Sequence, residues 1–378
     1  MTVFLDARYL DGSYSGIGTY SRYLIEHLAK LDQTTKFQVL VRPQFRQALN
    51  VGDNFEFFTY KPKVVSYQTL FRLQVFLNEL KPKIVHSLAP VSPIFYDGPL
   101  IVTLHDLQPF LDPHFHSKRS AFARTGYQLF YRWAYPTVLS KAKWIICDSY
   151  STRDDALAYY PGLRPKLIVN HLGIDQQVVP PTAQEQNSVQ ERFGLLNSPY
   201  FLYYGSSRPN KNLVNLIKAY NRFLTIASSE WQNSKLVLVI SKSRFFRDVQ
   251  RQITRNKLEG KVIIIDPLES REHQALLAGA HALLFPTKYE GFGFPVLEAM
   301  QLGVPVLAGE SGSLPEICGD KAVLVDPDDV DAITKSIHLI ATNAGLRERL
   351  KVEGISQARL FDWDRTAQSM LDIYKLLF

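Results

Sequence analysis

The segment from Ala282 to Ala308 contains the pattern that most constrains the fold. Apolar residues fill 282–286 and 304–308, and short continuous apolar runs are typical of buried strands. Between them, Pro295 suits the first turn of a helix and Gly303 suits its end. The sequence therefore predicts strand, glycine-rich loop, helix and strand, which is the repeating unit of a parallel sheet.

Two glutamates, Glu290 and Glu298, flank the predicted start of that helix. In open α/β sheets, ligands bind at the carboxyl ends of strands, and helix N-termini favour anionic groups. Because helical side chains tilt toward the N-terminus, Glu298 should point back at the loop that carries Glu290. We interpret the segment as a site for a ligand that is phosphorylated and rich in hydroxyl groups.

The same alternation of strands and helices extends along the chain. Strand-like runs occupy 2–6, 37–41, 55–60, 83–87, 100–104, 144–147, 166–169, 200–204, 235–240 and 262–265. This predicts an α/β protein with two mostly parallel sheets, and a chain of 378 residues is expected to form two domains. We place them at 1–175 and 200–362, joined by a polar, glutamine-rich linker at 176–199, with a last helical segment at 363–378.

Composition and charge exclude several classes of protein. No apolar run approaches the roughly 18 to 20 residues of a membrane span. An acid, Asp6, follows the first residue too closely for a secretory signal, and there are two cysteines, so we expect a cytoplasmic protein with reduced thiols. Residues 1–175 hold 20 Lys and Arg against 14 Asp and Glu, but these are scattered, and no nucleic-acid-binding module is present.

Two further loops follow predicted strands in the first half of the chain. A glycine-rich turn with Gly16 and Gly18 suits close approach of a phosphate to the backbone. The dinucleotide fingerprint fails, because Ser21 stands where its third glycine would be. His105 comes directly after the strand that ends at Leu104, where either a ligand-binding or a purely structural histidine is expected.

The segment 118–133 combines an apolar stripe with basic residues. Phe122, Leu129 and Trp133 recur at helical spacing, while Lys118 and Arg132 fall on other sides of the helix. Two interpretations remain open. The stripe faces the protein core, or it touches anionic lipid or a lipid-linked acceptor as a peripheral membrane contact.

Taken together, these residues resemble the retaining nucleotide-sugar glycosyltransferases of family 4, which have the two-domain GT-B fold. The resemblance covers nearly the whole chain. It is carried by Gly16-Ile17-Gly18-Thr19-Tyr20, Thr103-Leu104-His105-Asp106-Leu107, Pro113, Gly173-Ile174-Asp175, Lys211-Asn212, Pro286, Glu290-Gly291-Phe292-Gly293, Pro295, Glu298-Ala299-Met300, Gly303-Val304-Pro305-Val306, Gly312-Ser313-Leu314-Pro315-Glu316 and Trp363.

The resemblance implies two Rossmann-like domains that face a central cleft, with the C-terminal helix returning to the first domain. It implies that Glu298 binds the nucleotide ribose and that Glu290 contacts the donor sugar, so the two are not an acid–base pair. Backbone N–H groups of Gly291, Phe292 and Gly293 would hold the sugar and phosphate.

The remaining implied contacts concern the diphosphate and the sugar. Lys211 and an arginine would clamp the diphosphate, Gly16 and Gly18 would approach it, and His105 would meet the sugar. Relatives commonly carry the arginine where this chain has Ser206 or Asn210, so we assign the role to Arg208.

The implied reaction moves a hexose, with retention and without a metal or other cofactor, from a nucleotide diphosphate sugar to a saccharide acceptor. UDP-glucose and GDP-mannose are the first donor candidates, and the acceptor belongs to a polysaccharide or a lipid-linked oligosaccharide. Two alternatives stay open, namely a soluble-acceptor enzyme that makes a small glycoside and an inactive subunit that binds nucleotide sugar.

Two helix starts are also expected from the sequence: Ser313 and Glu316 form a capping box, and Asp329 lies at a helix start.

Overall fold

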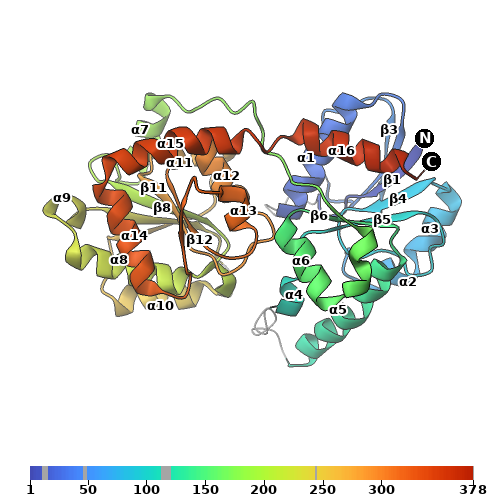
Figure 1. The fold of residues 1–378 in the computed structure, drawn as a ribbon, viewed down its shortest axis with the longest axis horizontal. Coiled ribbons are helices and arrows are strands. Elements are labelled where there is room, and N and C mark those ends of the chain that lie inside the picture. Colours follow the sequence, from blue (N-terminus) through green and yellow to red (C-terminus); the bar gives the residue numbers. More distant parts are fainter. Residues whose placement is uncertain (11–15, 46–48, 112–120, 243–244, 378) are drawn as a thin grey trace. The chain divides into compact units, whose positions relative to one another are not determined.

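The computed structural model describes residues 1–10, 16–45, 49–111, 121–242 and 245–377. These residues form two compact units (Figure 1). Unit 1 comprises Met1–Gly173 and Phe361–Phe378, and unit 2 comprises Ile174–Leu360. Each unit is built around its own parallel sheet, as the α/β pattern of the sequence predicts.

Unit 1 contains a seven-stranded sheet in the order β3-β2-β1-β4-β5-β6-β7, in which every paired strand runs parallel to its neighbour. Its strands are β1 (Thr2–Asp6), β2 (Lys36–Val41), β3 (Phe55–Thr59), β4 (Ile84–Ser87), β5 (Leu100–Leu104), β6 (Trp144–Cys147) and β7 (Leu167–Val169). β1, β4, β5 and β6 are almost wholly buried. Sheets covered on both faces by helices produce such continuous apolar runs.

The helices of unit 1 are α1 (Gly16–Leu31), α2 (Tyr67–Phe71), α3 (Leu73–Leu80), α4 (Gln108–Leu111), α5 (Ala121–Lys141), α6 (Tyr150–Tyr159), the 3-10 helix η1 (Pro161–Lys166) and α16 (Trp363–Lys375). The C-terminal helix α16 lies beside α1 (Figure 1). Asp364 at the start of α16 contacts His27 and Lys30 of α1, with distances of 2.6 and 2.5 Å. The chain thus returns to unit 1, as predicted.

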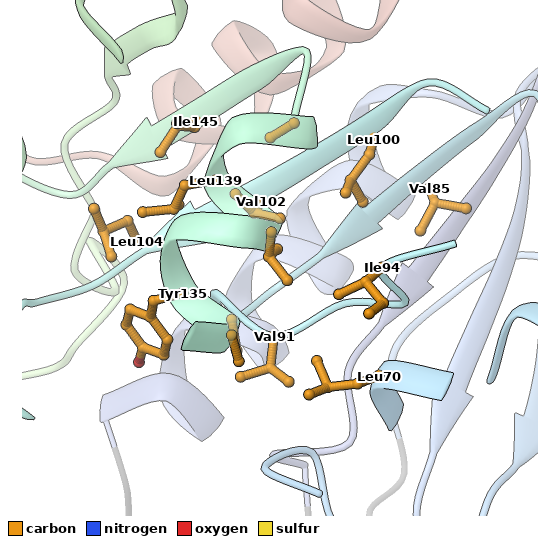
Figure 2. Close-up of a cluster of buried hydrophobic side chains, with 14 of the residues drawn as sticks. Leu70, Val85, Val91, Ile94, Leu100, Val102, Leu104, Tyr135, Leu139 and Ile145 are labelled. Atoms are coloured by element: carbon orange, nitrogen blue, oxygen red, sulfur yellow. The ribbon is translucent and has the colours of Figure 1, made fainter. Parts of the chain in front are cut away.

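One part of the unit 1 core joins the sheet to α5 and α2. Figure 2 shows Val85, Leu100, Val102 and Leu104 from the strands against Tyr135 and Leu139 of α5. Leu70 of α2 belongs to the same cluster and lies near Val91 and Ile94. This core fixes β4, β5 and β6 side by side and therefore fixes the loops that follow them.

Unit 2 contains a six-stranded parallel sheet in the order β10-β9-β8-β11-β12-β13. Its strands are β8 (Tyr200–Gly205), β9 (Lys235–Ile240), β10 (Val262–Ile265), β11 (Ala282–Phe285), β12 (Val306–Gly309) and β13 (Val323–Val325). Its helices are α7 (Ala183–Arg192), the 3-10 helix η2 (Pro209–Lys211), α8 (Leu213–Ile226), α9 (Ser229–Gln232), α10 (Phe246–Arg255), α11 (Ser270–Ala278), α12 (Phe294–Gln301), α13 (Leu314–Cys318), α14 (Val330–Thr342) and α15 (Ala344–Ala358).

The segment 176–199, which the sequence indicated as a linker, lies within unit 2 and contains helix α7. Thr182 and Glu185 form a capping box at the start of α7, and the helix packs against α11. A polar helix with one buried side chain, Val189, has the composition of a linker, because most of its residues face water.

Candidate active site

The loops that carry the candidate residues of unit 2 meet where the strand order reverses. From β8 the chain proceeds to β9 and β10 on one side and later to β11, β12 and β13 on the other. The loops after β8 and β11 are therefore neighbours, and such switch points are the usual ligand sites of open α/β sheets.

Lys211 and Glu290 form a close ion pair at this point. Lys211 follows β8, Glu290 follows β11, and Nζ lies 2.6 and 2.7 Å from the two carboxylate oxygens. The side chains are 17% and 11% exposed, so the pair is shielded but open at one edge. Nζ also lies 5.9 Å from the centre of the Phe285 ring. The pair therefore places one positive and one negative group side by side at the switch point.

Glu298 has a different environment, although only the end of the loop and the first turn of α12 separate it from Glu290. It lies in α12, and its Oε2 accepts a hydrogen bond of 2.5 Å from the hydroxyl of Tyr204. Burial raises the pKa of Glu298, and the Tyr204 hydrogen bond opposes this only in part. Burial and the nearby Glu298 charge raise the pKa of Tyr204, so the phenol stays protonated and donates.

A second loop, after β12, packs against the Glu290 loop and donates hydrogen bonds to it. Ser313 donates from its hydroxyl to the carbonyls of Glu290 and Phe292, at 3.1 and 2.6 Å. Gly312 has φ of 58°, and a Cβ there would lie 2.6 Å from the Glu290 oxygen. The backbones approach so closely that only glycine fits.

Ser313 therefore does not form the capping box that the sequence indicated. It precedes α13 with helical backbone angles, and its side chain makes no cap hydrogen bond. The hydroxyl has one proton, which it donates to the carbonyls of the neighbouring loop. The expectation at Asp329 is confirmed, because its carboxylate accepts from two N–H groups at the start of α14.

In unit 1, His105 lies among the ends of three neighbouring strands. It follows β5, Asp148 follows β6 and Leu88 follows β4. Nδ1 lies 2.6 Å from Asp148 Oδ2, and Nε2 lies 2.9 Å from the Leu88 carbonyl. Burial alone would lower the pKa of His105, but the charge and hydrogen bond of Asp148 outweigh it and the pKa is raised. Both partners only accept, so both ring nitrogens donate.

Two family models match successive parts of the chain. The model described as Glycosyltransferase Family 4 matches residues 14–178, and the model described as Glycosyl transferases group 1 matches residues 186–357. The chain belongs to the family 4, group 1 glycosyltransferases. Together the two matches span both sheets, so the family assignment covers both units and their candidate sites.

Individual proteins resemble this glycosyltransferase over most of their length. The "O-antigen chain mannosyltransferase B" of Escherichia coli is 28% identical over 384 residues, which cover 96% of either chain. The structure of a sucrose-phosphate synthase from Thermosynechococcus elongatus has a TM-score of 0.78 at 19% identity, with 100% and 99% covered. That of HepE from Anabaena, in complex with UDP-glucose, has a TM-score of 0.76 at 17% identity, with 99% of each chain covered. Together these structures establish the GT-B fold.

The other predicted site residues of this glycosyltransferase occupy loop and helix ends. Gly291, Phe292 and Gly293 lead into α12, and Gly293 has φ of 110°. Gly16 and Gly18 lie in the first turn of α1. Residues 11–15, directly before Gly16, and the motif residue Pro113 lie outside the described part of the chain. The roles of these residues in binding the donor remain predictions.

Arg208 and Asn210 occupy different environments, although both belong to the loop after β8. Arg208 is exposed and lines a pocket of about 340 Å³ together with Phe245 and Lys288. Asn210 is buried, and its side chain donates to the Tyr289 carbonyl at 3.2 Å. Asn210, at one of the two positions where the family resemblance implies an arginine, therefore links this loop to the Glu290 loop. The diphosphate role of Arg208 stays a prediction.

Sequence reasoning missed Tyr204, Asp148 and the actual contacts of Ser313. Tyr204 lies at the end of an apolar strand and Asp148 follows one, and a polar group at a strand end is the only signal that marks either of them.

Among the described residues, no group of three or more His, Cys, Asp or Glu side chains is placed to hold a metal ion. Nor does any helix in the described ranges have the length and apolar character to cross a membrane.

Proposed function

We propose that this protein transfers a hexose from a nucleotide diphosphate sugar to a saccharide acceptor. The observation that carries the proposal is the pairing of Lys211 with Glu290 at the switch point of unit 2, beside the partly buried Glu298. These groups suit a ligand in which a diphosphate lies between two hydroxyl-bearing rings.

Each carboxylate has one role in the proposal. Glu298, already accepting from Tyr204, takes hydrogen bonds from the ribose hydroxyls. Glu290 contacts the donor sugar near its reacting carbon. Neither is placed as a glycosidase acid or nucleophile, because Glu290 is neutralised by Lys211 and Glu298 is held by a phenol.

The other proposed contacts bind the diphosphate and the sugar of the donor. Lys211 and Arg208 bind the diphosphate, whose charge increases as the sugar departs. Backbone N–H groups of 291–293 bind phosphate and sugar, and Gly16 and Gly18 approach the diphosphate. His105 contacts the sugar.

The proposed chemistry retains the anomeric configuration. The acceptor oxygen bonds to the anomeric carbon on the face from which the bond to the diphosphate breaks. The acceptor proton passes to an oxygen of the departing diphosphate. The positive charge of Lys211 and the N-terminus of α12 stabilise the leaving group, so the step requires no metal or other cofactor.

UDP-glucose and GDP-mannose are the donors we favour. A relative of similar length is named as a mannosyltransferase of an O-antigen chain, and a similar structure contains UDP-glucose. The same relative supports a polysaccharide or lipid-linked acceptor over a small soluble one. An intact Lys211–Glu290 pair supports an active enzyme over an inactive binding subunit.

A panel of nucleotide sugars, incubated with the protein and without acceptor, tests the donor proposal. We expect slow release of nucleoside diphosphate from one of the two favoured donors, unchanged by EDTA. With an acceptor, proton NMR of the product should show the anomeric configuration of the donor. Release from no nucleotide sugar would overturn the proposal, and an inverted product would overturn retention.

We also propose that unit 1 contacts an anionic membrane surface as a peripheral protein. An aromatic surface, defined here as Tyr67, Phe71, Val75, Phe95, Leu129 and Trp133, has side chains that are 37% to 63% exposed. Phe71 joins its parts, because its ring centre lies 6.4, 6.0 and 5.9 Å from those of Tyr67, Phe95 and Trp133. Contiguous exposed aromatic groups mark binding surfaces.

In segment 118–133, the core interpretation fits one described residue and fails for two others. Phe130 is buried, as a core-facing stripe requires, but Leu129 and Trp133 are 63% and 45% exposed. Lys118 and the side chain of Phe122 lie outside the described part. The core explanation is therefore wrong for Leu129 and Trp133.

Basic residues near the aromatic surface favour anionic lipid. Residues 61–83 contain five Lys or Arg and one acid, and the described residues 125–147 contain three Lys or Arg and no acid. Aromatic and basic side chains together favour the interface of an anionic bilayer.

Sedimentation with vesicles tests the membrane contact. At low salt the protein should sediment with phosphatidylglycerol vesicles and much less with phosphatidylcholine vesicles. Trp133→Gln combined with Phe95→Gln should reduce binding, whereas Val352→Gln, an equally exposed apolar residue of unit 2, should not. Absence of binding to phosphatidylglycerol, or binding unchanged by the double variant, would overturn this contact.

A further inference from the structure

A row of buried polar side chains crosses unit 1 from the C-terminal helix to the neighbourhood of His105. The Tyr374 hydroxyl of α16 lies 2.7 Å from His86 Nδ1. His86 Nε2 lies 2.9 Å from Thr103 Oγ1, which lies 3.0 Å from the Tyr20 hydroxyl. We call Tyr374, His86, Thr103 and Tyr20 the buried row, and all four are at most 2% exposed.

The buried row ends against His105. The edge of the Tyr20 ring packs on the His105 ring, with 5.0 Å between centroids and 74° between planes. Tyr20 belongs to α1, His86 to β4 and Thr103 to β5. Hydrogen bonds thus link α16, two strands and α1, and a ring contact from α1 extends the row to His105.

His86 and His105 differ in charge, although both are histidines of the same region. Burial, with a smaller contribution from the charge of His105, lowers the pKa of His86 to about 3. His86 is therefore neutral and can accept on one nitrogen while it donates from the other. His105 carries the positive charge, because Asp148 and, more weakly, Asp106 face it.

Asp148 is the group that fixes this charge and the ring. It is 2% exposed, and one of its oxygens, Oδ2, contacts His105 Nδ1 at 2.6 Å. Its other oxygen, Oδ1, has no hydrogen-bond partner among the described residues. A buried carboxylate with a hydrogen bond to only one oxygen is costly, and its ion pair with the imidazolium offsets part of that cost.

Leu88 fixes the remaining ring nitrogen of His105. Its carbonyl accepts from Nε2 at 2.9 Å, so neither nitrogen offers a lone pair. A doubly protonated His105 cannot take a proton from an acceptor hydroxyl, which agrees with the departing diphosphate as the base. What this histidine offers the donor is a fixed positive charge.

We propose that Asp148 and Tyr374 are positioning residues for His105. Asp148 keeps the imidazole charged and oriented, and Tyr374 holds Tyr20 in place against it through His86 and Thr103. The inference rests on the proposed contact between His105 and the donor sugar. It makes the C-terminal helix part of the machinery that orients this histidine.

Two variants of matched shape test the proposal in the full chain. Asp148→Asn removes the charge, and Tyr374→Phe removes the hydroxyl that begins the buried row. Asp148→Asn should lower kcat about 10- to 100-fold at pH 8, the size of effect seen when a metal-bound histidine loses the partner that orients its ring. Turnover should recover as the pH is lowered and His105 regains its proton. Tyr374→Phe should lower kcat several-fold and leave KM for the donor unchanged.

NMR of histidine-labelled protein provides a readout that does not depend on activity. In the wild type, both ring nitrogens of His105 should be protonated at neutral pH. Asp148→Asn should shift the titration of His105 to lower pH, and Tyr374→Phe should change the shifts of its ring. Thr103→Val, which breaks the buried row on the far side of His86, should reproduce the effect of Tyr374→Phe.

A control and a reference variant separate the possible failures. Tyr220→Phe removes an equally buried hydroxyl, which donates to Ser234 in unit 2, and should leave the His105 signals unchanged. If His105→Ala lowers turnover while Asp148→Asn and Tyr374→Phe keep wild-type turnover and wild-type His105 signals, the positioning role is overturned. If His105→Ala leaves turnover unchanged, the contact with the donor is overturned, and the NMR signals alone then decide whether Asp148 and Tyr374 hold the ring.

Discussion

Glu298 shows how the surroundings of one residue determine its chemistry. Its carboxylate is partly buried and accepts a hydrogen bond from the phenol of Tyr204, whereas the carboxylate of Glu290 forms an ion pair with the ammonium group of Lys211. Burial raises the pKa of Glu298 because it disfavours the charged form. A ribose-binding role requires that charged form, since only the ionised carboxylate accepts from both hydroxyls.

Donor affinity should therefore depend on pH through Glu298. Above its raised pKa the group is ionised and binds the ribose, and below it the protonated group loses acceptor capacity. The dissociation constant of the nucleotide sugar should increase as pH falls, beginning at a higher pH than for an ordinary glutamate. Titration calorimetry between about pH 7 and 4.5 measures it, and Glu298→Gln should remove most of the dependence. Equal pH dependence in both proteins would assign it to another group.

The sequence and the family resemblance together predict roles for the two glutamates, the glycines between them and Lys211, and these roles remain predictions. Tyr204 and Asp148 could not be predicted, because each acts on a residue more than 40 positions away. The same reason explains Ser313, whose hydroxyl binds a loop rather than its own helix.

At the scale of elements, the loop after β12 acts as a support for the loop after β11. Gly309 and Gly312 pass so close to Thr287 and Glu290 that a Cβ would lie 2.2 and 2.6 Å from their carbonyl oxygens. Ser311 and Ser313 add hydrogen bonds to the same loop. The position of Glu290 therefore depends on residues of the next strand and its loop.

Gly312→Ala should displace the Glu290 loop and lower turnover. The added Cβ meets the backbone of Glu290, and backbone cannot move aside as a flexible side chain can. We expect a loss of about 2 to 4 kcal/mol in the free energy of unfolding, from strain and overpacking together. Urea denaturation and turnover of the favoured donor measure the two effects.

Gly260→Ala is the matched control for that variant. Gly260 also has a left-handed backbone, with φ of 77°, but a Cβ there meets nothing within 4 Å. It should cost about 1 kcal/mol, from backbone strain alone, and keep wild-type turnover. Equal losses of activity in the two variants would contradict the supporting role of the β12 loop.

Elements were predictable where the hydrophobic pattern was strong. β1, β5, β6, β9 and β10 have the predicted bounds, because each is a short apolar run that the sheet buries. Helix α7 was taken for a linker, because its only buried side chain, Val189, gives no apolar stripe. The pattern also failed for α5, whose exposed Leu129 and Trp133 look like core residues in the sequence.

At the scale of the whole molecule, the last helix connects the end of the chain to unit 1. Trp363 is 1% exposed, and its ring stacks on Tyr23 of α1 at 5.5 Å between centroids. A Cβ at Gly173 would lie 2.1 Å from the Trp363 nitrogen, so the two chain segments that leave unit 1 touch. Unit 1 therefore depends on residues from both ends of the sequence.

Trp363→Ala should destabilise unit 1 and leave unit 2 intact. Removal of a buried tryptophan costs about 3 to 5 kcal/mol, because the cavity does not fully collapse. Hydrogen–deuterium exchange should accelerate in peptides from α1, β1 and β4 and stay unchanged in those from β8 and β9. Leu360→Ala, at a residue that is 60% exposed, should change neither set. Acceleration in unit 2 alone would contradict the assignment of α16.

The division of work between the two glutamates is the central claim, and steady-state kinetics of nucleoside diphosphate release tests it most directly. Glu298→Ala should weaken donor binding by about 1.5 to 3 kcal/mol, the loss expected for charged hydrogen bonds, and raise KM accordingly. Glu290→Ala should mainly lower kcat, because Glu290 contacts the reacting sugar. Wild-type KM and kcat in both variants, with any nucleotide sugar that the protein turns over, would contradict the account.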